Sequence, residues 1–304
     1  MLRPLPHRGD VVAAGAVTLA ALVLLLQLRF DGVWSHGVHF VCAAAAAGFV
    51  GALALQSERE GPEPRPYQSA LMATTFALAV PALTRLAQLL GSDGLDSSGT
   101  LAWVGGTLAA LGLALARARG SALCLLLGAV SVVIALVCFV DWAFSPSRAD
   151  AFRWLLATLT ALFALATVGL RDRSPARAVA VADAGGLAAL ALGLTFAVDQ
   201  IFAVQTFGPG AGAGWELFLY ACGFGLCAYA AVDRAPGPGW IGAAVLVVTT
   251  LVAAGGKATL VGWPLVLGAA AAALLLVGLR PSRPLPPAPG SGETAQVFEI
   301  RDER

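Results

Sequence analysis

The feature of this sequence that most limits its fold is a succession of long apolar segments separated by short connections. A helix that spans a bilayer needs about 20 mostly apolar residues, and ten segments of the chain meet that requirement. Gly, Pro, Asp and Arg, which form turns or break helices, are frequent in the connections. The expected spans are 11–28, 35–55, 68–90, 100–116, 121–143, 152–170, 178–204, 215–232, 239–255 and 259–279.

The composition excludes an ordinary soluble domain. Of 304 residues, 58% are hydrophobic and 12% are charged, against about 25% charged residues in a typical soluble domain. A soluble fold could not bury that much apolar surface. We therefore expect an all-α integral membrane protein, with a polytopic transmembrane domain over 1–280 and a Pro-rich, disordered cytoplasmic tail over 281–304. The net charge of +1 excludes the large basic surface that a nucleic-acid partner requires.

Basic residues predict the orientation of these spans. The first apolar segment follows Arg3 and Arg8 as in a signal peptide, but it is as long as a full span and lacks a small-residue cleavage site. We interpret it as an uncleaved first helix. Twelve arginines lie on the side of the N-terminus before the tail is counted, and four basic residues lie on the other side. The positive-inside rule then places both termini in the cytoplasm. Because Arg outnumbers Lys 18 to 1, as in GC-rich bacterial genomes, we expect a bacterial inner membrane.

Similar residues recur along the chain and indicate an internal repeat. Five tryptophans begin the even-numbered spans, on the outer side of the membrane. The fifth and seventh spans end in matching text, Val-Asp-Trp-Ala-Phe at 140–144 and Val-Asp-Gln-Ile-Phe at 198–202. This pattern favours five tandem up-down helical hairpins at intervals of about 50–70 residues, each with an outer turn. The alternative is the aromatic belt that any membrane protein can show. The five tryptophans are Trp34, Trp103, Trp154, Trp215 and Trp263.

Ionisable residues inside a membrane are candidates for function. His36 and His39 are three residues apart and thus share one helical face. They could share a proton or bind a metal, although two ligands alone make no metal site, and the alternative is a polar cap at the interface. Asp141, Asp199 and Glu216 lie near the outer ends of their spans. If the hairpins pack side by side, Asp141 and Asp199 meet the two histidines in an outward-opening pocket that carries protons; otherwise they are solvated carboxylates.

Two further charges lie within the apolar segments. Arg85 follows Pro81 in the third span, where it either pairs with an acid such as Asp141 or extends to the membrane surface. Asp183 lies near the start of the seventh span, where the positive end of the helix dipole stabilises a carboxylate. We expect it to cap that helix. The five cysteines all fall in apolar segments, which indicates packing rather than disulfide or metal chemistry.

Two classes of function fit these observations. The first is a carrier for a small or lipophilic solute, proton-coupled through Asp141 and Asp199. The second is a scaffold or assembly subunit, which binds a partner protein through its lipid-facing helices or its tail, where the alternating residues of 297–304 suit strand addition to a partner's sheet. Sequence motifs of the common enzyme classes are missing. We therefore expect no catalytic activity and no cofactor.

Overall fold

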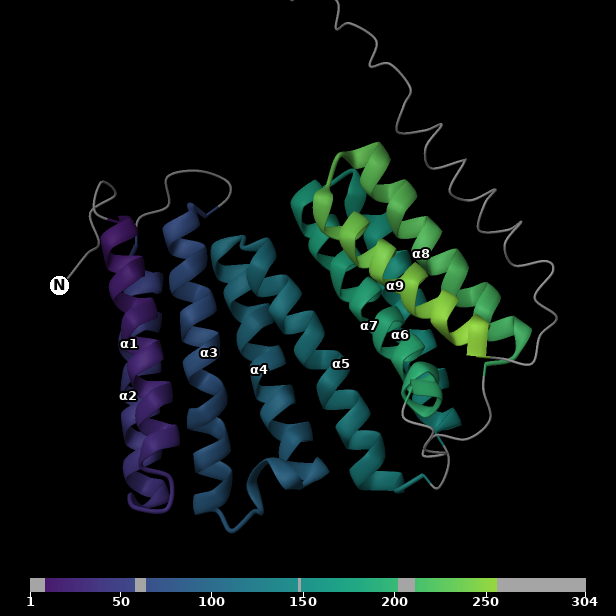
Figure 1. The fold of residues 1–304 in the computed structure, drawn as a ribbon. Helices are drawn as coiled ribbons and strands as arrows, with labels where there is room; N and C mark the ends of the chain where they lie inside the picture. The colour runs from purple at the N-terminus through teal and green to yellow at the C-terminus, as the bar shows by residue number, and fades with distance from the viewer. Residues whose placement is uncertain (1–8, 58–63, 147–148, 202–210, 256–304) are drawn as a thin grey trace, which may run out of the picture. The chain divides into compact units, whose positions relative to one another are not determined.

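The structure, a computed structural model, describes residues 9–57, 64–146, 149–201 and 211–255, without the side chains of 199–201 and 254–255. These residues form long α-helices and one short 3-10 turn, and consecutive helices run in opposite directions (Figure 1). The elements are α1 Gly9–Arg29, α2 His36–Gln56, α3 Pro66–Leu89, η2 Gly94–Asp96, α4 Ser98–Arg119, α5 Ala122–Phe144, α6 Asp150–Arg171, α7 Pro175–Ile201, α8 Ala213–Asp233 and α9 Pro236–Gly255.

Nine helices in the described ranges are long and apolar enough to cross a membrane. They coincide with the first nine predicted spans to within a few residues at each end. The chain is therefore an all-α, multi-pass membrane protein, as predicted. The tenth predicted span, 259–279, and the predicted tail, 281–304, lie outside the described residues.

The helix ends follow from local sequence. We call the end of the bundle where α1 begins the first face, and the end where α1 stops the second face. At the first face, α3, α7 and α9 begin with Pro66, Pro175 and Pro236, because proline suits the first position of a helix, where no backbone N–H is needed. The α5 helix begins instead after Ser121, whose Oγ accepts a 3.2 Å hydrogen bond from the Cys124 amide.

The helices pair differently from the predicted hairpins. Close packing joins α2 to α3, α4 to α5, α6 to α7 and α8 to α9, across the turns at the first face. The predicted hairpins instead paired helices across the turns at the second face, and those pairs contact one another far less. The packed units are thus offset by one helix from the predicted ones.

Glycines explain why the packed pairs approach so closely. A Cβ atom on Gly112 of α4 would lie 2.6 Å from the Gly128 Cα of α5. In α8 and α9, a Cβ atom on Gly242 would lie 2.8 Å from the Gly223 carbonyl oxygen. Small residues at a crossing bring two backbones together, and van der Waals packing is a main source of helix association in a bilayer.

The buried side chains form two main clusters. One joins α1, α2 and α3, with contributions from α4 and α5. The other joins α5 to α9 around α7, which is the most buried of the spanning helices described. The α7 helix packs against α5, α6 and α9 and so forms the centre of the second half of the bundle.

Candidate functional site

Polar side chains of the first three helices meet at the second face, around Arg85 of α3. Its guanidinium forms an ion pair with Asp31 at 2.8 Å and donates hydrogen bonds to the side-chain oxygens of Gln27, at 3.2 Å, and Gln88, at 3.0 Å. Its NH1 lies 3.5 Å from His36 Nδ1. We call these five residues the Arg85 network. The acid that Arg85 pairs with is therefore Asp31, in the turn after α1, in place of the predicted Asp141.

The two histidines occupy different environments. His39 is 1% exposed, and its Nε2 lies 3.3 Å from the Phe30 carbonyl oxygen. Gln27 donates a 2.8 Å hydrogen bond to the His39 carbonyl oxygen, so His39 is tied to the Arg85 network through its backbone. His36 is exposed and faces Arg85. Sequence reasoning selected both histidines and Arg85, and the structure places them together at one end of α1–α3.

We expect this end of the bundle to lose stability in acid. The Arg85 guanidinium holds the pKa of Asp31 below its usual range, first by hydrogen bonding and then by its charge. A lowered folded-state pKa stabilises the fold above the unfolded value of about 3.9, and this contribution is lost as the pH falls through the folded value. Thermal unfolding in detergent from about pH 7 to about pH 3 should therefore show that Asp31→Asn costs stability at neutral pH and progressively less below about pH 4. The exposed Asp96 provides the control: Asp96→Asn should cost less at neutral pH, and an equal cost would contradict the assignment.

Asp141 does not lie beside the two histidines as predicted. Asp141 is exposed in the last turn of α5, whereas the packing partners of α2 are α1 and α3. Asp199 belongs to the last turns of α7, and its side chain lies outside the described part. Glu216, in the first turn of α8, is 6% exposed. All three lie toward the second face, but Asp141 does not share a pocket with His36 and His39.

A second charged group at this face was missed by sequence reasoning. Arg153, in the first turn of α6, is 2% exposed, and its guanidinium carbon lies 4.0 Å from the centre of the Phe196 ring of α7. Its NH1 donates to Asp150 at 3.3 Å. Arg153 was counted only as one of the basic residues outside the cytoplasm. The sequence could have revealed its burial, because Arg153 is spaced along α6 so that it shares one helical face with other buried residues. These are Leu156, Thr160 and Thr167.

A cavity of about 380 Å³ lies along the middle of α6, α7 and α8. We call it the central groove. The α7 helix contributes only alanine and glycine to it, and a Cβ atom on Gly225 of α8 would meet nothing within 4 Å. The Thr160 and Thr167 hydroxyls donate to carbonyl oxygens of their own helix, so the lining is mostly apolar. The lining residues are Thr160, Ala164, Thr167, Val168, Ala182, Gly185, Gly186, Ala189, Phe218, Ala221, Cys222, Gly225, Leu226 and Tyr229.

Contacts at both ends of the central groove hold α6 beside α8. At the second face, the rings of Trp154 and Trp215 lie 4.9 Å apart. At the first face, Arg171 and Asp233 form a 2.6 Å ion pair. Between these contacts the two helices are not in close packing. The groove therefore lies at membrane depth, between an aromatic contact and an ion pair.

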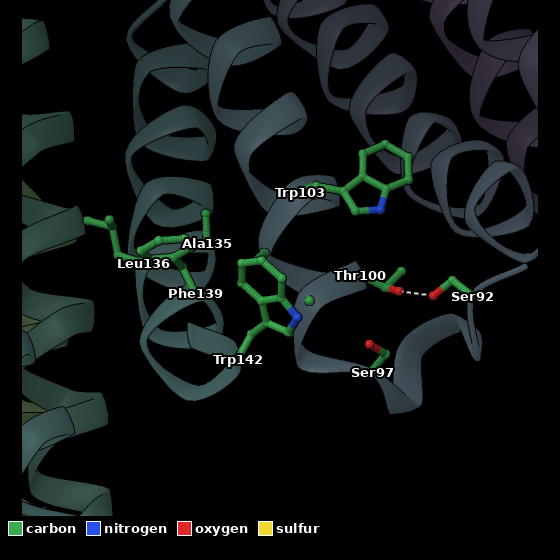
Figure 2. A pocket seen from close by; sticks show the side chains of 10 residues that line it. Ser92, Ser97, Thr100, Trp103, Ala135, Leu136, Phe139 and Trp142 are labelled. Carbon is green, nitrogen blue, oxygen red and sulfur yellow. Dashed lines mark hydrogen bonds between the residues drawn. The ribbon is translucent and has the colours of Figure 1, made fainter. Parts of the chain in front are cut away.

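A second hollow, of about 630 Å³, lies at the second face between α4 and α5. Figure 2 shows Trp103 and Trp142 on its walls, and the hydrogen bond between the Ser92 and Thr100 hydroxyls. Tryptophans with such polar neighbours are typical of the level of the lipid headgroups. This hollow is larger than the central groove, and the described residues that line it include no charged side chain.

Asp183 has a different role from the predicted helix cap. Because α7 begins at Pro175, three residues before the predicted start, Asp183 lies more than two turns inside the helix. It contacts the start of α9, where a Cβ atom on Gly237 would lie 2.7 Å from Asp183 Oδ2. In the described ranges, no group of three or more His, Cys, Asp or Glu side chains could hold a metal ion.

These features define a multi-pass α-helical membrane protein with charged clusters at the second face and an apolar groove at membrane depth. Comparison with known proteins adds no relative: no family model, no curated protein and no solved structure matches the chain.

Proposed function

We propose that this protein is a carrier for a lipophilic solute, which it binds in the central groove. The supporting observation is the groove itself, an apolar cavity of about 380 Å³ between helices that are held together at both ends. Binding sites for small molecules are usually concave and mostly apolar. The solute crosses or enters the membrane chemically unchanged.

The lining favours a lipophilic solute over an ion or a sugar. The hydroxyls of Thr160 and Thr167 already donate within their own helix, and of the lining hydroxyls only that of Tyr229 lacks a partner among the described residues. A polar solute would therefore leave most of its hydrogen-bonding groups unpaired. Such unpaired groups cost several kcal/mol in hydrocarbon. A hydrocarbon chain needs no such partners. From the arginine distribution, we propose that the first face is the cytoplasmic one, in a bacterial plasma membrane.

Filling the groove should stop the transport. Gly225→Leu places a larger side chain in open space that belongs to the groove, so it should block the solute without a clash. In liposomes of zwitterionic phospholipid, dithionite quenches fluorescent lipid probes only in the outer leaflet. The native protein is expected to move the probe between leaflets, and Gly225→Leu to slow this movement at least fivefold.

The matched control is Gly48→Leu in α2, where a Cβ atom also meets nothing within 4 Å and the residue is exposed. It should leave probe movement unchanged. If the native protein moves no probe, or if both variants behave alike, the carrier proposal is wrong, and the scaffold interpretation gains support.

Proton coupling through Asp141 and Asp199 is a separate hypothesis. It predicts that a pH gradient accelerates solute movement and that the double change Asp141→Asn with Asp199→Asn removes this acceleration. The measurement is the same probe movement with and without the gradient. An acceleration that survives in the double variant would rule the coupling out.

A further inference from the structure

Arg153 carries more hydrogen-bond donors than its surroundings use. Its side chain is 2% exposed, and only NH1 has an acceptor, Asp150. Its Nε and NH2 atoms are buried, and neither has a hydrogen-bond partner among the residues that the structure describes. The Phe196 ring covers the guanidinium at 4.0 Å and contributes a cation–π contact. That contact leaves the in-plane N–H groups of Nε and NH2 available.

Buried donors without acceptors are costly, and for a charged group the cost rises further. The Nε and NH2 edge of a guanidinium presents two parallel N–H bonds, which match the two oxygens of a carboxylate or phosphate. An anion with two oxygens would therefore satisfy both donors at once and balance the charge that the exposed Asp150 neutralises only in part.

Arg153 and Phe196 lie on the same faces of α6 and α7 as the residues that line the central groove. Arg153 precedes Thr160, a groove residue of α6, by seven residues, and Phe196 follows Ala189, a groove residue of α7, by seven. Seven residues are two helical turns, so these pairs share a face and are about 10 Å apart along the helix. The Phe196 ring, which covers the guanidinium, lies 5.9 Å from the Trp215 ring, and the Trp215 ring lies 6.5 Å from that of Phe218, a groove residue.

We propose that Arg153 binds the acidic head of an anionic amphiphile whose hydrocarbon tail occupies the central groove. This inference rests on the proposed function and names its substrate class: a long-chain molecule with a single carboxylate or phosphate head. The head lies at the second face, at the level of the lipid headgroups, and the tail runs past Phe196 and Trp215 toward Tyr229. From Arg153 to Val168, the far groove residue of α6, the helix rise gives about 22 Å.

The test compares an acid with its neutral analogue. The full chain is placed in nanodiscs of zwitterionic phospholipid and exposed to a long-chain fatty acid with a diazirine at its tail, or to the matching fatty alcohol. Peptide mass spectrometry locates the labelled residues, and a titration gives the half-labelling concentration. The acid is expected to label groove residues at a concentration at least tenfold lower than the alcohol does.

The variants assign this preference to Arg153. Arg153→Gln should remove the preference for the acid and leave labelling by the alcohol unchanged, which also shows that the groove is intact. Arg153→Lys, which keeps the charge and loses the paired donors, should retain only part of it. Arg173→Gln, at an exposed arginine of the opposite face, should retain all of it. A second acid, a long-chain phosphate monoester, competes with the fatty acid and shows which head is preferred.

Four results separate the head site from the proposed function. Equal labelling by acid and alcohol in the native protein, or a preference that persists in Arg153→Gln, overturns the head site. A preference for the acid that appears only in Asp199→Asn would mean that the Asp199 carboxylate occupies the Nε and NH2 donors of Arg153. That result also overturns the head site. Failure of both probes to label the groove contradicts the proposed function itself.

Discussion

Gly112→Ala is expected to lower the thermal unfolding midpoint of the purified protein, although alanine is the better helix former. The new Cβ atom would lie 2.6 Å from Gly128 Cα, 2.8 Å from Gly128 N and 2.9 Å from the Cys124 carbonyl oxygen. These are backbone atoms, so no side-chain rotation relieves the clash, and α4 must move away from α5. Overpacking of this kind costs about 1–3 kcal/mol, and Gly112→Leu should cost more.

Gly106→Ala in the same helix is the matched control. Its Cβ atom would meet nothing within 4 Å, so the helix preference of alanine, about 1 kcal/mol over glycine, should leave the midpoint unchanged or raise it. The midpoint should therefore fall for Gly112→Ala and should not fall for Gly106→Ala, and detergent thermal melts measure both. Equal shifts for the two variants would show that the α4–α5 contact is looser than the structure has it.

Arg85→Leu is the second change with a large expected effect. The change leaves the buried side-chain oxygen of Gln27 without its hydrogen-bond donor. It also removes the contacts of Arg85 to Asp31, His36 and Gln88. A buried polar group that loses its partner costs about 1–3 kcal/mol. The unfolding midpoint should fall by a similar extent to that of Gly112→Ala, and protease should cleave the turn between α1 and α2 faster.

The charge and the geometry of Arg85 can be separated. Arg85→Lys keeps the positive charge near Asp31, but an ammonium on a flexible stem lacks the planar fork that reaches several acceptors. It should restore only part of the loss. Arg117 is exposed at the first-face end of α4, so Arg117→Leu should change the midpoint little. Full restoration by lysine would mean that charge alone holds this end of the bundle.

Much of the architecture could be predicted because spanning a bilayer requires long apolar helices. The nine described helices, from α1 to α9, lie where the apolar segments predicted them. Which helices pack together could not be predicted in the same way. The decisive contact of α4 with α5 depends on Gly112 meeting Gly128, and glycine is too common in this chain, at 35 residues, for its partners to be read from the sequence.

The candidate site was predicted in part. His36, His39 and Arg85 were selected because polar residues stand out in apolar segments, and they lie together. Their partner Asp31 was not among the candidates, since a turn of six residues can place a carboxylate in many directions. The central groove could not be predicted, because Ala182, Gly185 and Ala189 differ in no way from residues that pack a helix crossing.

The short turns at the first face have a consequence for how the protein is made. Only two residues separate α4 from α5, three separate α6 from α7 and two separate α8 from α9. We expect each of these pairs to enter the membrane as one unit, since so short a turn keeps its two helices together. Breaks in the chain should therefore be tolerated at the second face. Co-expressed fragments divided between α5 and α6, or within 202–210, are expected to reassemble, whereas a division at Gly120 would separate partners that insert together.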